Sequence, residues 1–202
     1  MSCIVMKSHR SGARVAAFAA VMVALANVLS AFSIGLTRVG QIGVDLSNLA
    51  VFIGGIYGGP VLGFLIGLLG GTVPGIQFGP LGGLGWLGLF GLTFGKSLTG
   101  LTTGTLRRIF NLGLERNPVF FRTVLVVLMG YVPEFFFTIY FFLSLVPYFL
   151  GPVPWVTFGW LLSLLAKGWA ETAVISIIIA TLTRNAGFNA LVFNLASPRT
   201  DS

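Results

Sequence analysis

Charged, thiol and imidazole side chains are scarce in this chain of 202 residues. Only 8% of the residues are charged, and the sequence holds a single cysteine, Cys3, and a single histidine, His9. The sequence therefore lacks the cysteine and histidine residues that a disulfide framework, a zinc site or Ser-His or Cys-His catalysis would need. We expect no bound metal and no cofactor, and most hydrolytic chemistry is disfavoured.

Hydrophobic residues are abundant in the sequence. They make up 55% of the chain, and the mean hydropathy is +0.96, whereas about 25% of residues are charged in an average globular protein. This composition predicts an all-α integral membrane protein. A length of 202 residues suits one domain of five or six helices, because each crossing needs roughly 20 apolar residues.

Positive charge is present in excess, with a net charge of +7. Nine of the twelve Lys and Arg residues fall in three clusters, which are Lys7, Arg10 and Arg14, then Arg107, Arg108, Arg116 and Arg122, then Arg184 and Arg199. These clusters lie beside apolar runs and lack the aromatic and basic interleaving of a nucleic-acid surface. We expect them to face lipid headgroups and cytoplasmic partners, and we expect no nucleic-acid binding.

The apolar runs predict the crossings. The clear ones cover residues 13–32, 81–106, 119–146 and 155–182, after an N-terminal tail of residues 1–12 and before a C-terminal tail of residues 184–202. The first run also resembles a cleaved signal peptide, but it is longer than the usual apolar region of one.

Residues 46–71 form either one long crossing or two short helices, 46–58 and 60–72, broken at Gly58-Gly59-Pro60. Proline removes a backbone donor there, and glycine permits a tight turn. With six helices, all three basic clusters lie on one side, as the positive-inside rule requires. We therefore predict six transmembrane helices over residues 13–183 in the plasma membrane, with both termini cytoplasmic.

Glycines recur every fourth residue across this break, at Gly55, Gly59, Gly63, Gly67 and Gly71. Small residues at this spacing let helix backbones approach closely. Membrane helices are also glycine-rich in general, but five glycines in register favour a packing surface.

Residues 44–70 read VDLSNLAVFIGGIYGGPVLGFLIGLLG. This stretch resembles the second and third helices of the substrate-binding S components of energy-coupling factor (ECF) vitamin transporters. The length and the predicted cytoplasmic termini agree with that family. The resemblance implies a binding and translocating subunit for a water-soluble vitamin or related small molecule.

The resemblance also implies partners, namely a transmembrane coupling protein and two ATP-binding cassette ATPases. In the family, small residues on the first helix dock onto the coupling protein. Ala16, Ala20 and Ala24 form the matching face here, although such a face can equally serve packing within one protein.

Ionisable residues within the predicted crossings are candidate functional residues. They are Lys96, Glu134, Lys167 and Glu171, and each is costly in lipid unless it faces the bundle interior. Lys167 and Glu171 have the spacing of an intrahelical ion pair, so they form a structural pair or line a solute cavity. For Glu134 we expect Lys96 or Lys167 as the partner, unless a cationic ligand neutralises it.

The resemblance places solute binding beneath the loops after the first, third and fifth helices. Those loops offer Arg38, Gln41 and Asp45, then Gln77 and Phe78, then Tyr148 and Trp155. We expect a substrate site formed by Asn48, Gln77, Trp86, Glu134, Trp155, Lys167 and Glu171. Interfacial aromatic residues also belong to ordinary membrane belts.

Three functional classes follow from these residues. An importer subunit driven by separate ATPases is favoured, and a self-sufficient secondary transporter or channel is the alternative. A membrane enzyme ranks last, because its nucleophile and base are missing. The stretch Phe90 to Ser97 ends in Gly-Lys-Ser like a P-loop, but it lacks the first glycine and a preceding strand. ATP hydrolysis is therefore expected on partner subunits.

Overall fold

The computed structural model describes residues 2–40, 45–112, 120–154 and 156–196. All regular structure in these ranges is helical. The elements are α1 (Ser2–Gly40), α2 (Ser47–Gly70), α3 (Thr72–Phe78), α4 (Gly85–Ile109), α5 (Phe120–Tyr140), the π-helix η2 (Phe141–Leu145), α6 (Val146–Leu150), α7 (Phe158–Arg184) and α8 (Ala186–Ala196). The prediction of an all-α fold is thus confirmed.

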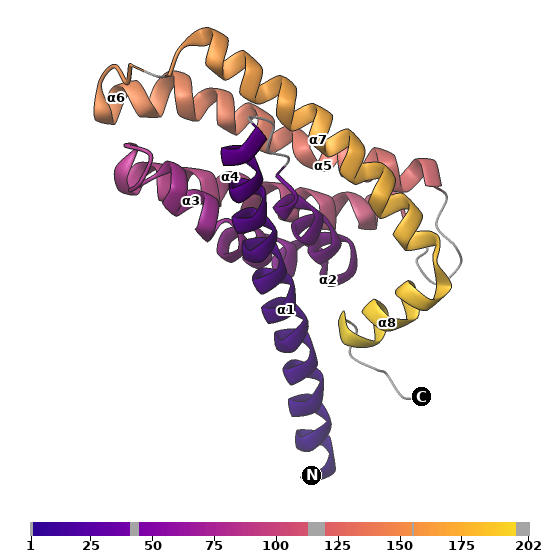
Figure 1. Ribbon diagram of the computed structural model, residues 1–202. Helices are drawn as coiled ribbons and strands as arrows, with labels where there is room; N and C mark the ends of the chain where they lie inside the picture. The colour runs from indigo at the N-terminus through magenta and orange to yellow at the C-terminus, as the bar shows by residue number, and fades with distance from the viewer. Residues whose placement is uncertain (1, 41–44, 113–119, 155, 197–202) are drawn as a thin grey trace.

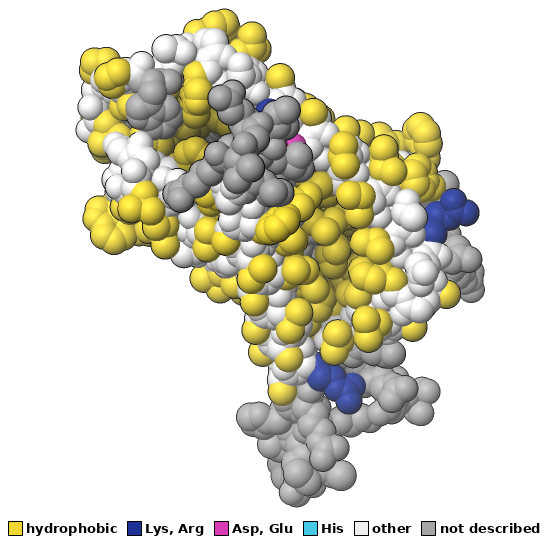
Figure 2. Space-filling model, viewed as in Figure 1, with side chains coloured by type: hydrophobic (Ala, Val, Ile, Leu, Met, Phe, Trp, Pro, Cys, Tyr) yellow, Lys and Arg dark blue, Asp and Glu magenta, His cyan; other side chains and the backbone are white. Residues whose placement is uncertain are grey.

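Four of the described segments are long and apolar enough to cross a membrane. They are Gly12–Gly35, Ser47–Phe78, Phe120–Leu150 and Phe158–Arg184. Helix α4 is not among them, because glycine, threonine and Lys96 lower its hydropathy. Figure 2 shows hydrophobic side chains spread widely over the viewed surface, with Lys and Arg at its right edge and near its lower end.

Helix α2 folds back on itself at Gly59. This glycine has φ 82° and ψ −176°, a conformation that favours glycine, and Pro60 follows it. A Cβ atom on Gly63 would lie 2.8 Å from the Cα atom of Gly55, whereas residues eight apart in a straight helix are about 12 Å apart. The predicted break at Gly58-Gly59-Pro60 is confirmed, and α2 consists of two antiparallel arms.

Both arms of α2 pack on α4 through glycine. A Cβ atom on Gly55 in the first arm would lie 2.7 Å from the carbonyl oxygen of Gly100, and one on Gly67 in the second arm would lie 2.4 Å from the carbonyl oxygen of Lys96. The backbones of the two helices therefore touch with no side chain between them. The predicted glycine surface exists, and Gly59 occupies the bend in it.

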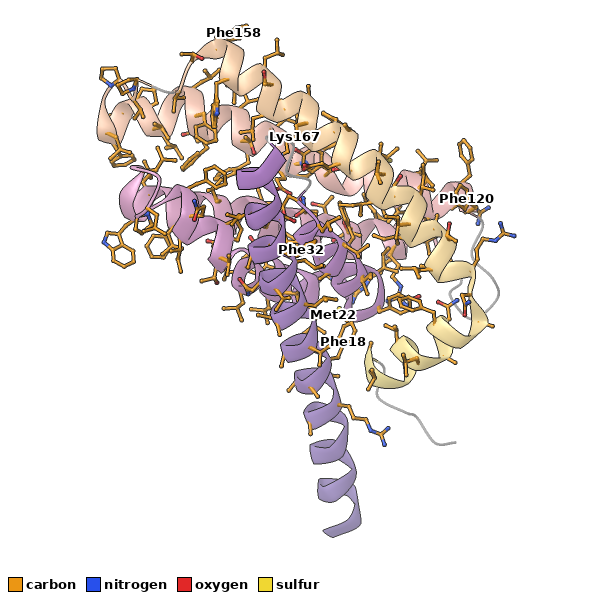
Figure 3. The ribbon with its side chains drawn as sticks, viewed as in Figure 1. Phe18, Met22, Phe32, Phe120, Phe158 and Lys167 are labelled. Atoms are coloured by element: carbon orange, nitrogen blue, oxygen red, sulfur yellow. The ribbon has the colours of Figure 1, made fainter. Side chains whose placement is uncertain are left out.

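Helices α5 and α7 lie side by side along one flank of the bundle, while α1 crosses the remaining helices and projects beyond them (Figure 1). Helix α8 turns back from the end of α7, and its residue Val192 joins a core cluster with Phe18 of α1. Figure 3 shows Phe18 on the side of α1 that faces α8.

Two predicted boundaries need correction. Residues 72–80 were expected to be a loop, but Thr72–Phe78 is helix α3. Residues 184–202 were expected to be a tail, yet they contain α8, which buries Val192 against the bundle. In both cases contacts with neighbouring helices stabilise a helix too short to stand out in the sequence.

Candidate functional site

Lys96 in the middle of α4 is the centre of a buried polar cluster. Its side chain is 6% exposed. Its ammonium donates hydrogen bonds to Asp45 Oδ2 at 2.7 Å, to Ser47 Oγ at 2.5 Å and to Asn48 Oδ1 at 2.9 Å. An ammonium has three donors, so these acceptors use all of them. Lys96 thereby joins α4 to the start of α2.

Asp45 is held from both sides. Its Oδ1 atom accepts hydrogen bonds from the backbone and the hydroxyl of Ser47, at 3.0 and 2.6 Å. Burial by itself raises the pKa of Asp45, but the charge of Lys96 and hydrogen bonds from Lys96 and Ser47 outweigh burial and leave that pKa below its ordinary value of 3.8. Asp45 is therefore the ionised partner of Lys96.

Two further carboxylates approach this centre from α5 and α7. Thr99, one turn after Lys96 on α4, donates a hydrogen bond to Glu134 Oε2. Glu171 Oε1 accepts from the backbone N–H of Asp45 at 2.9 Å. Lys96 attracts both glutamates electrostatically. Four separate segments of the chain thus bring charged side chains to one place.

The predicted ion pair within α7 is confirmed. Lys167 Nζ lies 3.5 Å from Glu171 Oε1, and the side chains are 45% and 11% exposed, respectively. Glu171 therefore points into the bundle, while Lys167 borders it.

The formal charges of the cluster do not cancel. Asp45, Glu134 and Glu171 are acidic, whereas Lys96 and Lys167 are basic, so the sum is −1 when all five are ionised. Within the described residues, the ion pairs are Lys96 with Asp45 and Lys167 with Glu171. Glu134 is thus left without a cation of its own in this part of the chain.

Aromatic rings cover the cluster on the α5 and α7 side. The Tyr131 ring packs edge-on against Trp169 with centroids 5.4 Å apart, and Trp169 packs against Phe135 at 5.8 Å. Tyr131 is buried and precedes Glu134 by three residues on α5, so the two side chains lie on the same face of that helix. The faces of such rings attract cations as well as planar apolar groups.

A pocket of about 360 Å³ opens further along the same two helices. Its walls come from η2, α6, the following loop and the start of α7, and they include Phe142, Val146, Val153, Phe158 and Leu161. A volume of this size accommodates a small organic molecule. The pocket begins beside the π-helix, a distortion that is frequent at functional sites. Phe142 is 8 residues from Glu134, or about 12 Å along the helix.

The structure gathers some of the predicted site residues and separates others. Asn48, Glu134, Lys167 and Glu171 belong to the cluster. Trp86 is 70% exposed and lies ten residues before Lys96, about 15 Å along α4. Gln77 lies on α3, outside the cluster. Trp155, Gln41 and the side chain of Arg38 lie outside the described residues.

Sequence reasoning identified the cluster only in part. It placed Asp45 in an outer loop near the solute and named Lys96 or Lys167 as the partner of Glu134, whereas the direct ion pair of Lys96 is with Asp45. Ser47 and Thr99 were not singled out. The polar stretch Asp45-Leu46-Ser47-Asn48 before a long apolar run was the available signal, since polar groups in such a place need buried partners.

The small-residue face of α1 is open. Ala16, Ala20 and Ala24 are all exposed, whereas Phe18 and Ala26 on other sides of the helix are buried. The predicted docking face is therefore not used for packing among the described residues.

Comparison with known proteins returned no match: no family model, no curated protein and no solved structure is similar to the chain. Within the described residues, no three His, Cys, Asp or Glu side chains lie close enough to hold a metal ion.

Proposed function

We propose that this protein is the substrate-specific binding and translocating subunit of an ATP-driven importer of the ECF type, for a water-soluble vitamin or related small molecule. The observation that carries the proposal is the cluster of Asp45, Glu134 and Glu171 around the buried Lys96 inside the helix bundle. An apolar pocket opens further along, between η2, α6 and the start of α7. Ionisable groups inside an apolar bundle are costly, and they commonly mark the path or site of a polar solute.

The proposed topology has six crossings in the plasma membrane with both termini cytoplasmic. The two arms of α2 and the length of α4 support it. Arg107 and Arg108 lie at the end of α4, Arg122 at the start of α5 and Arg184 at the end of α7. Consecutive antiparallel helices bring these positions to one side, where the positive-inside rule places the cytoplasm.

The proposed partners are a transmembrane coupling protein and two ATP-binding cassette ATPases. Support comes from the exposed face of Ala16, Ala20 and Ala24. Small side chains let a partner helix approach closely within the membrane, where van der Waals packing drives association. No ATP-binding loop is proposed for this chain, because the Gly-Lys-Ser stretch lies inside α4 and Lys96 is buried with its own partners.

Co-expression of the chain with a coupling protein and its ATPases tests this function. We expect the full complex to take up solute only with hydrolysable ATP. Replacing Ala16, Ala20 and Ala24 together with Leu should abolish co-purification with the coupling protein and leave solute binding intact. Val174→Leu is the control, since Val174 is exposed on α7, away from this face of α1. Failure of the parent chain to bind any coupling protein would refute the proposal.

A self-sufficient secondary transporter is the second candidate. The observation in its favour is Glu134, which binds Thr99 and has no ion-pair partner within the described residues. A carboxylate in that setting can exchange a proton during transport. Uptake into proteoliposomes that contain only this chain, driven by a proton gradient and absent from the Glu134→Gln variant, would favour this candidate.

A further inference from the structure

The charge balance of the buried cluster restricts the chemical class of the solute. We infer that the solute is a small organic cation, and that the Glu134 carboxylate is its counter-ion. The inference rests on the proposed function, in that it concerns the solute of the same site.

Both lysines of the cluster already have an acidic partner. The three N–H donors of Lys96 are used by Asp45, Ser47 and Asn48. An anionic solute would have to displace Asp45, whose side chain is 33% exposed, and would leave that carboxylate without its cation. Lys167 is partly exposed and shares its charge with Glu171. The cluster therefore has little positive charge to offer an anion.

Glu134 is the carboxylate whose charge a bound cation would neutralise. Its side chain packs on α4, where a Cβ atom on Gly95 would lie 3.6 Å from Glu134 Cγ. Its hydrogen-bond donor is the neutral hydroxyl of Thr99, and no Lys or Arg nitrogen of the described residues lies within ion-pair distance. When Asp45, Glu134, Glu171, Lys96 and Lys167 are all ionised, their formal charges sum to −1, and one positive charge from a solute brings that sum to zero.

The aromatic rings provide an independent indication of the same class. Tyr131, Phe135 and Trp169 lie against the acidic side of the cluster. Further along α5, Phe142 packs against Trp160 with centroids 5.1 Å apart and lines the apolar pocket. Aromatic faces attract quaternary and protonated amines by cation–π interaction. A cation with an apolar or planar body at Glu134 would contact the carboxylate together with the rings of the Tyr131 and Trp169 group.

Binding of charge-matched probes tests the inference on the full-length protein in lipid nanodiscs. One pair is choline and its uncharged isostere 3,3-dimethyl-1-butanol. A second set consists of three pyridine compounds that differ in charge. They are 1-methylnicotinamide, which is a cation, nicotinamide, which is neutral, and nicotinate, which is an anion. Dissociation constants come from isothermal titration. We expect each cation to bind at least about tenfold more tightly than its uncharged or anionic counterpart, as one charge-assisted contact provides.

Two variants with opposite expected effects separate a counter-ion role from a structural one. Glu134→Gln keeps an acceptor for Thr99 and should reduce the preference for cations to about unity. Lys167→Gln removes a competing cation and should increase that preference. A purely structural role would weaken binding of all probes in both variants. Elution volume and melting temperature of each variant report whether it is folded.

Several results would overturn the inference. They are equal or tighter binding of the neutral or anionic probe, no cation binding up to about 1 mM, and an unchanged cation preference in folded Glu134→Gln. Co-purification with a coupling protein does not depend on solute charge. If it persists while the cation preference is absent, only the solute class is wrong; if it is absent as well, the proposed function also fails.

Discussion

The two helix pairs that frame the polar cluster are joined in different ways. Between α2 and α4, backbone lies on backbone, since Cβ atoms on Gly63, Gly67 and Gly100 would meet carbonyl oxygens at 2.4 Å or less. Between α5 and α7, aromatic side chains fill the space, as with Tyr131 and Trp169. At these glycine contacts no side chain lies between α2 and α4, whereas rings separate α5 from α7, and a pocket of about 360 Å³ opens where η2 and α6 meet the start of α7.

This difference assigns separate tasks to the two sides of the cluster. Lys96 and Asn48 belong to the glycine-packed side and hold each other in fixed positions. Glu134 and Glu171 belong to the aromatic side, where side chains can adjust around a solute. A transporter needs both properties, because a rigid scaffold preserves the site while an adaptable wall admits the substrate.

The largest expected effect comes from removing the charge at the centre. Lys96→Met keeps the length of the side chain but leaves Asp45 without its cation, so we expect a loss of about 3–5 kcal/mol in stability. Thermal unfolding in detergent measures this loss. The double variant Lys96→Met/Asp45→Asn should recover part of it, because the uncompensated carboxylate is removed too. A single variant as stable as the parent would show that the ion pair does not hold α2 on α4.

A smaller effect is expected at the glycine contacts. In Gly100→Ala the new Cβ atom would lie 2.0 Å from the carbonyl oxygen of Gly63, so the backbones must separate, at a cost of about 1–3 kcal/mol. Gly95→Ala in the same helix is the control. Its Cβ atom would meet Phe137 and Glu134 at ordinary distances of 3.4 Å and 3.6 Å, and alanine favours the helix by up to about 1 kcal/mol. Equal melting temperatures for the two variants would contradict tight packing.

On the aromatic side we expect a change in binding rather than in stability. Val153→Trp projects a large ring into the apolar pocket from its loop, and we expect unfolding to shift by less than about 1 kcal/mol. Solute affinity should fall at least about tenfold if the pocket holds the body of the solute. Val61→Trp is the control, because Val61 is 72% exposed on α2. Unchanged affinity in Val153→Trp would exclude the pocket from the site.

The sequence predicts local features of this molecule well. Gly58-Gly59-Pro60 indicates the bend because proline and glycine act on their own residues. Lys167 and Glu171 indicate their ion pair because one helix fixes their spacing. The helical class follows from composition alone, since a membrane requires internally bonded segments.

The long-range contacts were not predictable in the same way. Asp45 and Lys96 are separated by 51 residues, and their pairing depends on how α2 docks on α4. The same docking explains why Lys96 forms its direct ion pair with Asp45 and attracts Glu134 only at longer range. The pocket is formed by η2, α6 and α7, and no periodicity in the sequence indicates that these walls meet.

The smallest expected effect concerns pH and tests whether the two sides of the cluster titrate separately. The folded pKa of Asp45 lies below its ordinary value of 3.8. A depressed pKa contributes stability that is fully present above the ordinary pKa and is lost as the pH falls through the folded one. We therefore expect the difference in melting temperature between the parent and Asp45→Asn to stay constant from about pH 8 to pH 5, and to shrink only below about pH 4. A difference that fades between neutral pH and about pH 5 would mean that Asp45 shares its proton with the glutamates, and the rigid and adaptable sides would then act as one electrostatic unit.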